Sequence, residues 1–141
     1  MRLLASTDIA LRVLILLGRE AAGAHLSVEA LATALGGLSR NNLHKIVQDL
    51  GALGVTRTVR GAGGGVMLAI PPNAIRLGSL VQRLEAEQAL VECNRPDGCA
   101  CTLLPDCRLR GMLGNAQSQF YRALDTQTLA DCLESSMQSG G

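Results

Sequence analysis

The sequence predicts a mainly α-helical protein with one small β-hairpin, and three observations support this fold class. Apolar residues recur at helical spacing along most of the chain. Helix-start signals stand at Ser27 and Ser39, each before a short apolar segment. The stretches VTRTVR (55–60) and VMLAI (66–70) are typical of strands, and GAGGG (61–65) forms a flexible turn between them.

The composition indicates a folded globular chain without a general attraction for polyanions. The 141 residues are 48% hydrophobic and 18% charged, which is typical of a globular protein. Phe120 and Tyr121 are the only aromatic residues, so the core is aliphatic and base stacking on aromatic platforms is excluded. The net charge is +1, so any nucleic-acid binding must use a local basic patch.

The first helix is expected over residues 7–17, beginning near Ser6–Thr7. The segment superficially resembles a secretion signal, but Asp8 and Arg12 interrupt its apolar run, and a membrane span needs about 20 apolar residues. We therefore expect a cytoplasmic protein without a membrane segment. One apolar stripe consists of Ile9, Val13, Leu16 and Leu17, with Leu11, Leu14 and Ile15 outside it. Because a helix that is apolar on most sides is usually buried on most sides, we expect it to lie between two packed bodies.

Two short helices follow, in SVEALATALG (27–36) and SRNNLHKIVQDLGALG (39–54), joined by a tight glycine-containing turn. In the second of these, Leu43, Ile46, Val47 and Leu50 have the spacing of a core face. Two helices joined in this way form a helix-turn-helix, and the hairpin after them makes it a winged helix-turn-helix. The order of the elements is more specific than any one of them.

The polar residues at the start of the second helix suit DNA recognition. Taken alone, these residues would be interpreted as a solvated helix face. Because a predicted wing follows them, DNA binding is the better interpretation. Arg and Lys can address guanine, Asn can address adenine, and arginines at a wing bind phosphate. The glycine turn lacks the Gly-Lys-Ser/Thr ending of a phosphate-binding loop. The candidate DNA-binding residues are Ser39, Arg40, Asn41, Asn42, His44, Lys45, Arg57, Arg60 and Gly61.

The second half of the chain predicts a dimer. After a helix in 75–85, a long helix is expected over 108–124, and a last short helix over 128–134. The long helix carries an apolar stripe that one small domain cannot easily bury, so pairing with a second copy is its natural use. The stripe consists of Leu109, Met112, Leu113, Ala116, Phe120, Ala123 and Leu124. The predicted organisation is a winged helix-turn-helix domain over 1–72 and, over 73–141, a dimerisation region that also contains the loop expected to bind an iron–sulfur cluster, whose cysteines are described next.

The stretch ECNRPDGCACTLLPDC (92–107) holds four of the five cysteines. Zinc sites usually present paired C-x2–4-C hooks, whereas these thiols are spaced C-x5-C-x-C-x5-C. Iron–sulfur clusters accept loosely spaced thiolates, which suits a loop of this length. Zinc and a metal-free redox thiol remain alternatives. Cys132 is expected to be a core thiol, and neither His25 nor His44 has a neighbouring nucleophile or acid, so an enzyme is not predicted.

These features together resemble the NsrR-type nitric-oxide-sensitive repressors, relatives of the iron–sulfur regulator IscR. The match covers nearly the whole chain. It is carried by S-T-D-x-A-L-R (6–12), S-R-N (39–41), V-R-G-x-G-G-G (59–65), C-x5-C-R-L (101–109) and L-D-x-x-T-L-A-D (124–131).

The resemblance implies a homodimer that binds an inverted-repeat DNA operator and holds one iron–sulfur cluster per subunit, [4Fe-4S] in preference to [2Fe-2S]. Its ligands would be Cys93, Cys101 and Cys107, with Asp8 contributed by the partner subunit. Because this loop has four cysteines and the family typically has three, Cys99 is the alternative to Cys101. An oxygen ligand is harder than thiolate, so its iron would be the exchangeable corner that nitric oxide attacks.

The predicted function is therefore a transcriptional repressor that loses operator binding when nitric oxide nitrosylates its cluster. A regulator of the same fold that senses iron or cluster status would share every motif. A different class, a zinc-stabilised DNA-binding or interaction module, would differ in colour, since zinc proteins are colourless and [4Fe-4S] proteins are brown.

Overall fold

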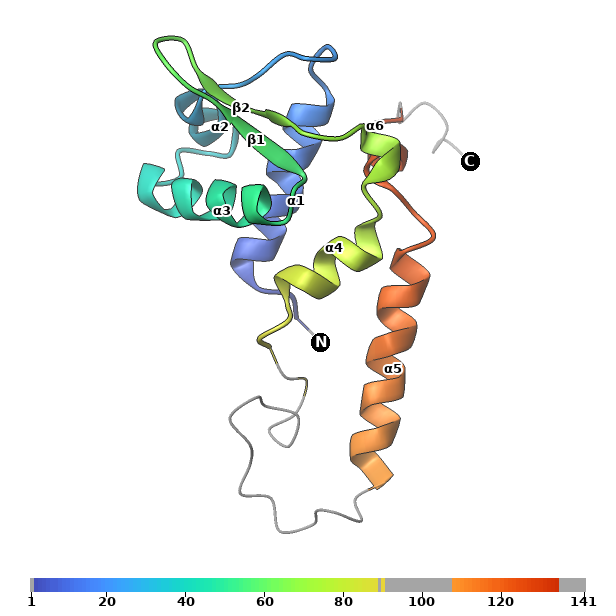
Figure 1. Ribbon diagram of the computed structural model, residues 1–141. Helices are drawn as coiled ribbons and strands as arrows, with labels where there is room; N and C mark the ends of the chain where they lie inside the picture. Colours follow the sequence, from blue (N-terminus) through green and yellow to red (C-terminus); the bar gives the residue numbers. More distant parts are fainter. Residues whose placement is uncertain (1, 89, 91–107, 135–141) are drawn as a thin grey trace. The chain divides into compact units, whose positions relative to one another are not determined.

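The computed structural model describes residues 2–88, 90 and 108–134, and the chain divides into two compact units (Figure 1). We call Ala5–Ile75 with Thr128–Gly141 the winged-helix unit, and Met1–Leu4 with Arg76–Gln127 the arm–helix unit. No helix in the described ranges is both long enough and apolar enough to cross a membrane. The predicted fold class, mainly helical with one antiparallel hairpin, is confirmed.

The first three helices of the winged-helix unit are α1 (Ala5–Gly18), α2 (Val28–Ala34) and α3 (Arg40–Ala52). Ser27 and Ser39 begin α2 and α3 as the sequence predicts. Each serine Oγ accepts a hydrogen bond from the backbone nitrogen three residues later, at 3.0 Å and 3.3 Å respectively. Such caps satisfy one of the four backbone N–H groups that a helix leaves free at its N-terminus.

The hairpin consists of β1 (Thr56–Val59) and β2 (Gly65–Leu68), which pair antiparallel along their whole length. Leu26 adds a short bridge to the outer side of β2. Its N–H donates to the Val66 carbonyl at 2.9 Å and its carbonyl accepts from the Val66 N–H at 2.8 Å. Gly65 makes this bridge possible, because a Cβ at this position would lie 2.2 Å from the Leu26 carbonyl oxygen.

An aliphatic core fills the winged-helix unit. Leu14 from α1, Leu31 from α2, and Leu43 and Leu50 from α3 are completely buried. A short terminal helix, α6 (Leu129–Leu133), joins this core through Leu129, whose backbone N–H donates to the Ile75 carbonyl at 2.9 Å. α6 also packs against α1, so the end of the described chain lies against its first helix.

α1 buries a face that differs in part from the apolar stripe of its sequence. Its buried residues are Thr7, Ala10, Val13, Leu14 and Leu17. Leu14 lies outside the stripe of Ile9, Val13, Leu16 and Leu17 and is completely buried, whereas Ile9 and Leu16 are half-buried. A helix that is apolar on nearly all sides gives no clear phase, so its sequence cannot say which apolar side faces the core.

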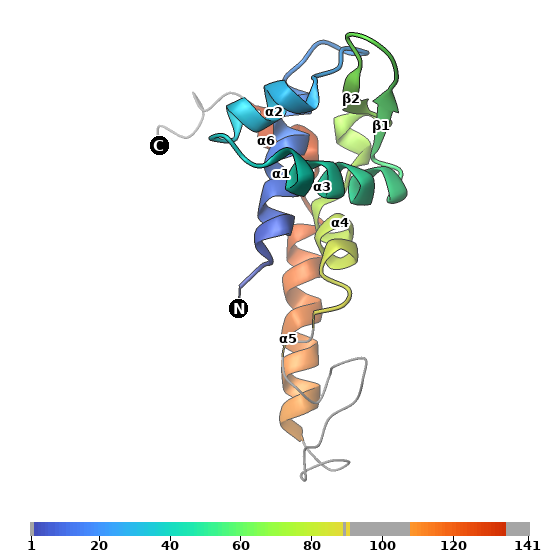
Figure 2. The same cartoon turned by 90° about the vertical axis from the view of Figure 1, so that its left-hand side faces the viewer.

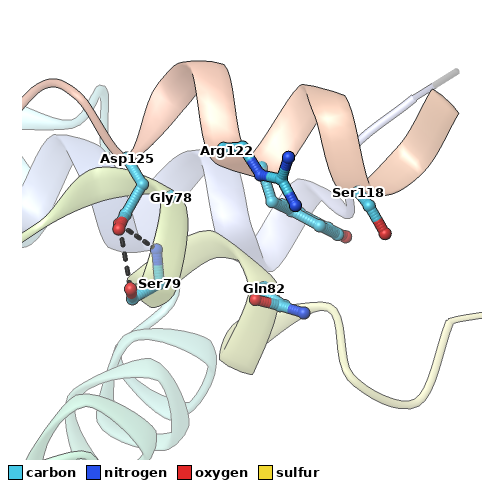
Figure 3. A pocket seen from close by; sticks show the side chains of 7 residues that line it. Gly78, Ser79, Gln82, Ser118, Arg122 and Asp125 are labelled. Atoms are coloured by element: carbon cyan, nitrogen blue, oxygen red, sulfur yellow. Dashed lines mark hydrogen bonds between the residues drawn. The ribbon is translucent and has the colours of Figure 1, made fainter. Parts of the chain in front are cut away.

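The arm–helix unit contains α4 (Leu77–Leu84) packed against α5 (Arg108–Leu124). The two helices meet at Gly78, where a Cβ would lie 2.1 Å from the Tyr121 carbonyl oxygen. At the same place Asp125 Oδ1 accepts hydrogen bonds from the Ser79 N–H at 2.6 Å and from its Oγ at 2.9 Å (Figure 3). These bonds favour the charged form and lower the pKa of the Asp125 carboxyl.

The apolar stripe of α5 is exposed in the single chain. The exposed fractions are 58% for Leu109, 64% for Met112 and 38% for Phe120. Tyr121, which faces α4, is the only buried residue of the helix within the described chain. Burying one leucine-sized side chain is worth about 1.5–3 kcal/mol, so the stripe leaves a considerable driving force unused in one copy.

Candidate nucleic-acid interface and metal ligands

α3 separates its core face from a polar face. Leu43, Ile46, Val47 and Leu50 are buried, as the spacing predicts. The polar residues that begin the helix are all exposed: Arg40, Asn41, Asn42, His44 and Lys45. The structure therefore leaves this set available to a partner on one helix, with its orientation fixed by four buried aliphatic side chains.

Two of the residues at the start of α3 already have partners. The Ser39 Oγ accepts a hydrogen bond as the helix cap, which uses one of its two lone pairs, while its O–H can still donate. Arg40 forms an ion pair with Glu29 of α2. Both side chains are more than 60% exposed, and an exposed pair contributes about 0–1 kcal/mol. DNA can therefore compete with Glu29 for Arg40 at little cost. No local sequence pattern predicts this pair.

The wing presents two exposed arginines, Arg57 on β1 and Arg60 just after it. Gly61 follows with a φ of +101°, a conformation that glycine adopts without strain. At the tip, His25 Nε2 hydrogen-bonds to the Gly63 carbonyl oxygen. A carbonyl only accepts, so Nε2 carries the proton. His25, which the sequence reasoning set aside, thus ties the wing tip to the segment before α2.

The recognition helix and the wing belong to the same unit, and α3 packs against β1 (Figure 2). All nine candidate DNA-binding residues therefore lie on the winged-helix unit, in α3, at its cap, or in the hairpin. Their contacts with DNA stay predictions.

Asp8 lies in the first turn of α1 and forms a bidentate ion pair with Arg12. The distances are 3.0 Å from Arg12 Nη2 to Oδ2 and 3.1 Å from Nε to Oδ1. The two side chains are 56% and 63% exposed. An acidic residue in a mostly apolar helix is thus balanced by an arginine one turn later, and its carboxylate stays accessible from solvent.

The remaining predicted ligands, Cys93, Cys99, Cys101 and Cys107, lie outside the described residues. Within the described ranges, no three histidine, cysteine or acidic side chains come together as a metal site. Cys132 is exposed, so its assignment as a core thiol was wrong: α6 turns Leu129 inward and Cys132 outward. Partial burial, and then the charge of Asp131, raise the pKa of the Cys132 thiol.

A helix-turn-helix with a free polar recognition face, followed by a β-hairpin wing, defines the winged helix-turn-helix class of DNA-binding regulators. The chain belongs to the Rrf2 family of transcriptional regulators. The sequence model of that family, described as an iron-dependent transcriptional regulator, matches residues 3–135.

Known regulators resemble the chain over nearly its full length. It is 42% identical over 134 residues to the HTH-type transcriptional regulator NsrR of Geobacillus kaustophilus, covering 95% of this chain and 90% of that protein. Identity to NsrR of Bacillus subtilis is 35%, covering 95% and 91%. The resemblance predicted from the motifs is thereby confirmed.

Solved structures show the same fold. T. potens IscR superimposes with a TM-score of 0.75 at 20% identity, covering 100% of this chain and 92% of that one. The oxidised form of Staphylococcus aureus CymR gives a TM-score of 0.71 at 24% identity, covering 96% and 98%.

Proposed function

We propose that the chain is a homodimeric repressor that carries an iron–sulfur cluster and releases its DNA operator in response to nitric oxide. The observation that carries the proposal is Asp8. A chain 42% identical to NsrR presents an exposed carboxylate in the first turn of a mostly apolar helix. The carboxylate is paired with Arg12 and is still open to solvent, so it is accessible to a metal held by a second subunit.

The donor set fits an iron–sulfur cluster in which one ligand differs from the others. Cys93, Cys101 and Cys107 would supply thiolates, and Asp8 of the partner subunit would supply an oxygen. Arg12 donates one hydrogen bond to each Asp8 oxygen, so each oxygen keeps a lone pair with which it could bind iron. When bound, the cluster would supply iron that reacts with nitric oxide, and the harder oxygen ligand marks the most exchangeable position.

The exposed stripe of α5 supports the homodimer. A second copy that pairs along this helix would bury Leu109, Met112 and Phe120, which one chain leaves in water. Replacing Met112 with glutamate is therefore expected to convert a dimer into a monomer, because the charge would be buried without a partner. Sedimentation equilibrium measures this change. Asn115→Glu, exposed on the same helix away from the stripe, is the control and should stay dimeric. A Met112→Glu protein that also stays dimeric would place the interface elsewhere.

Anaerobic purification followed by iron, sulfide and absorbance analysis tests the cofactor. We expect a brown protein with about four irons per chain, whose colour bleaches during titration with nitric oxide and whose operator affinity falls in parallel. A colourless protein that still contains zinc after anaerobic reconstitution would overturn the proposal and leave a DNA-binding fold with a structural metal.

The choice between Cys99 and Cys101 is open to a direct test. We expect Cys101→Ala to lose its cluster and Cys99→Ala to keep it, because the C-x5-C-R-L motif places Cys101 and Cys107 as neighbouring ligands. Iron per chain after anaerobic reconstitution is the measurement. Cys132→Ala, which removes an exposed thiol on α6, is the matched control and should bind as much iron as the unmodified protein. The reverse result for the first two variants would assign Cys99 as the ligand.

A second candidate function is regulation by iron or cluster status, which the description of the matching family as iron-dependent favours. The two functions separate when the intact, cluster-loaded protein is exposed to nitric oxide. Iron-status sensing predicts that operator affinity follows the iron supply. It also predicts that nitric oxide leaves operator affinity unchanged as long as the protein keeps its iron.

A further inference from the structure

The N-terminal arm of the chain is held by a buried glutamate. The Leu4 N–H donates to Glu85 Oε1 at 2.7 Å, across 81 positions of sequence. Glu85 ends α4, and only 5% of its surface is exposed. Leu4 is the residue immediately before α1. One side chain thus connects the end of α4 to the residue that precedes the first helix.

Burying this carboxylate has a considerable energetic cost. A charged group removed from water is unfavourable unless hydrogen bonds or opposite charges compensate, and glutamate is rarely so buried. Tyr121 of α5 is close enough that its pKa is raised, first by its own burial and then by the charge of Glu85. The arm, the end of α4 and α5 therefore meet at Glu85, all within the arm–helix unit.

The connections between the two units show why this contact matters. The chain passes from one unit to the other at residues 4–5, 75–76 and 127–128. Several bonds hold each of the last two crossings. Within the arm–helix unit, the Leu77 N–H donates to the Gln127 carbonyl and Arg76 Nη1 donates to the Asp125 carbonyl, both at 3.0 Å. Within the winged-helix unit, the Leu129 N–H donates to the Ile75 carbonyl at 2.9 Å. At the crossing after Leu4, the Leu4 N–H donates to the side chain of Glu85.

This crossing leads directly into functional elements. α1 carries Asp8 in its first turn, and α1 packs against the recognition helix α3. A restraint on Leu4 therefore acts on the end of a rigid helix that supports the DNA-reading face. α1 also has a completely buried core face, so it responds as one body rather than bending locally.

We propose that Glu85 is a positioning residue: it holds Leu4, the residue before α1, within the arm–helix unit, and this restraint couples that unit to operator binding. This inference rests on the proposed function for the nature of the signal. Two sites are coupled when a ligand at one changes the affinity of the other for its own ligand. Typical couplings change that affinity about 5- to 150-fold. Without the bond to Glu85, a change in the arm–helix unit is no longer transmitted through Leu4 to α1.

The test compares operator Kd for cluster-loaded and cluster-free protein in three variants. We expect the operator Kd of the cluster-free protein to differ from that of the cluster-loaded protein about tenfold or more when the chain is unmodified, and we call this factor the Kd ratio. Glu85→Gln keeps an acceptor oxygen for the Leu4 N–H and should retain most of the ratio. Glu85→Ala removes the acceptor and should bring the ratio towards one. Glu87→Ala, an exposed glutamate two residues later, is the control and should leave the ratio unchanged.

A second pair of variants removes the donor and leaves Glu85 intact. Leu4→Pro has no backbone N–H and should lose the ratio as Glu85→Ala does, whereas Leu4→Ala keeps the N–H and should retain it. This pair decides the question if Glu85→Ala does not fold. A ratio unchanged in Leu4→Pro would overturn the proposal.

Amide hydrogen exchange of Leu4 provides a readout independent of DNA and cofactor. A bond to a charged group should slow exchange, and Glu85→Ala should accelerate it about 10- to 100-fold. A Leu4 amide that exchanges equally fast in both proteins would overturn the inference. If the unmodified protein shows slow Leu4 exchange but a Kd ratio of one, the proposed function fails together with the coupling. A large ratio that survives in Glu85→Ala contradicts the coupling alone.

Discussion

Replacing Gly78 with alanine is expected to destabilise the arm–helix unit by about 2–3 kcal/mol. The new Cβ would lie 2.1 Å from the Tyr121 carbonyl oxygen, 2.4 Å from Asp125 Cβ and 2.6 Å from the Asp125 nitrogen. Two of these atoms are backbone, so α4 and α5 must separate to accommodate the methyl group. Their separation would also disturb the hydrogen bonds between Ser79 and Asp125. Urea denaturation measures the loss as a lower unfolding midpoint.

Gly51→Ala is the matched control, since Gly51 is also a helical glycine. A Cβ there would approach Thr56 no closer than 4.0 Å, an ordinary contact. Because alanine favours the helix over glycine by about 1 kcal/mol, this variant should be slightly more stable than the unmodified protein. Equal stability of Gly78→Ala and Gly51→Ala would mean that the approach of α4 to α5 is not as close as described.

The double replacement of Arg57 and Arg60 by alanine is expected to weaken operator binding by roughly 100-fold at moderate salt. Each arginine is exposed on the wing and would lose a charge-assisted bond to phosphate, worth about 1.5–3 kcal/mol. The stronger diagnostic is the dependence of affinity on salt. Because each lost phosphate contact removes about one released counterion, the slope of log K against log salt should fall by roughly 2.

The control for the wing is Arg19→Ala, which removes an exposed arginine of the same unit just after α1. It should leave both the operator affinity and the salt slope unchanged. Binding to unrelated duplex DNA separates the two kinds of contact, because phosphate contacts weaken all sequences equally and base contacts weaken the operator alone. A double variant that loses affinity only for the operator would mean that the wing reads bases.

Most of the secondary structure could be predicted because its signals are local. The serines that cap α2 and α3 act on backbone groups three residues away, and the core face of α3 repeats with the period of the helix. The hairpin follows from two β-prone stretches around a glycine turn. Each of these signals lies within a window of about ten residues, so the sequence alone is sufficient to read it.

The contacts that tie the elements together could not be predicted. Glu85 bonds to a residue 81 positions away, and His25 to one 38 positions away, while no periodicity links either pair. The most deeply buried face of α1 could not be read from its sequence, because leucine, isoleucine and valine occur on nearly all its sides. Cys132 was misplaced because α6 is too short, at five residues, for its apolar pattern to define an inward face.

The glycines of the wing differ in the substitutions that they tolerate. Gly61 and Gly63 have φ values of +101° and +76°, and a Cβ at either would meet nothing within 4 Å. At Gly64 and Gly65, however, a Cβ would lie 2.1 Å and 2.2 Å from a carbonyl oxygen. The first two positions are limited by backbone conformation, which is least demanding for asparagine or aspartate at Gly63, and the last two by space, which no other residue can satisfy. Variation among functional wings should therefore be concentrated in the turn, where a new side chain could change which DNA sequences are bound, while the start of β2 stays glycine.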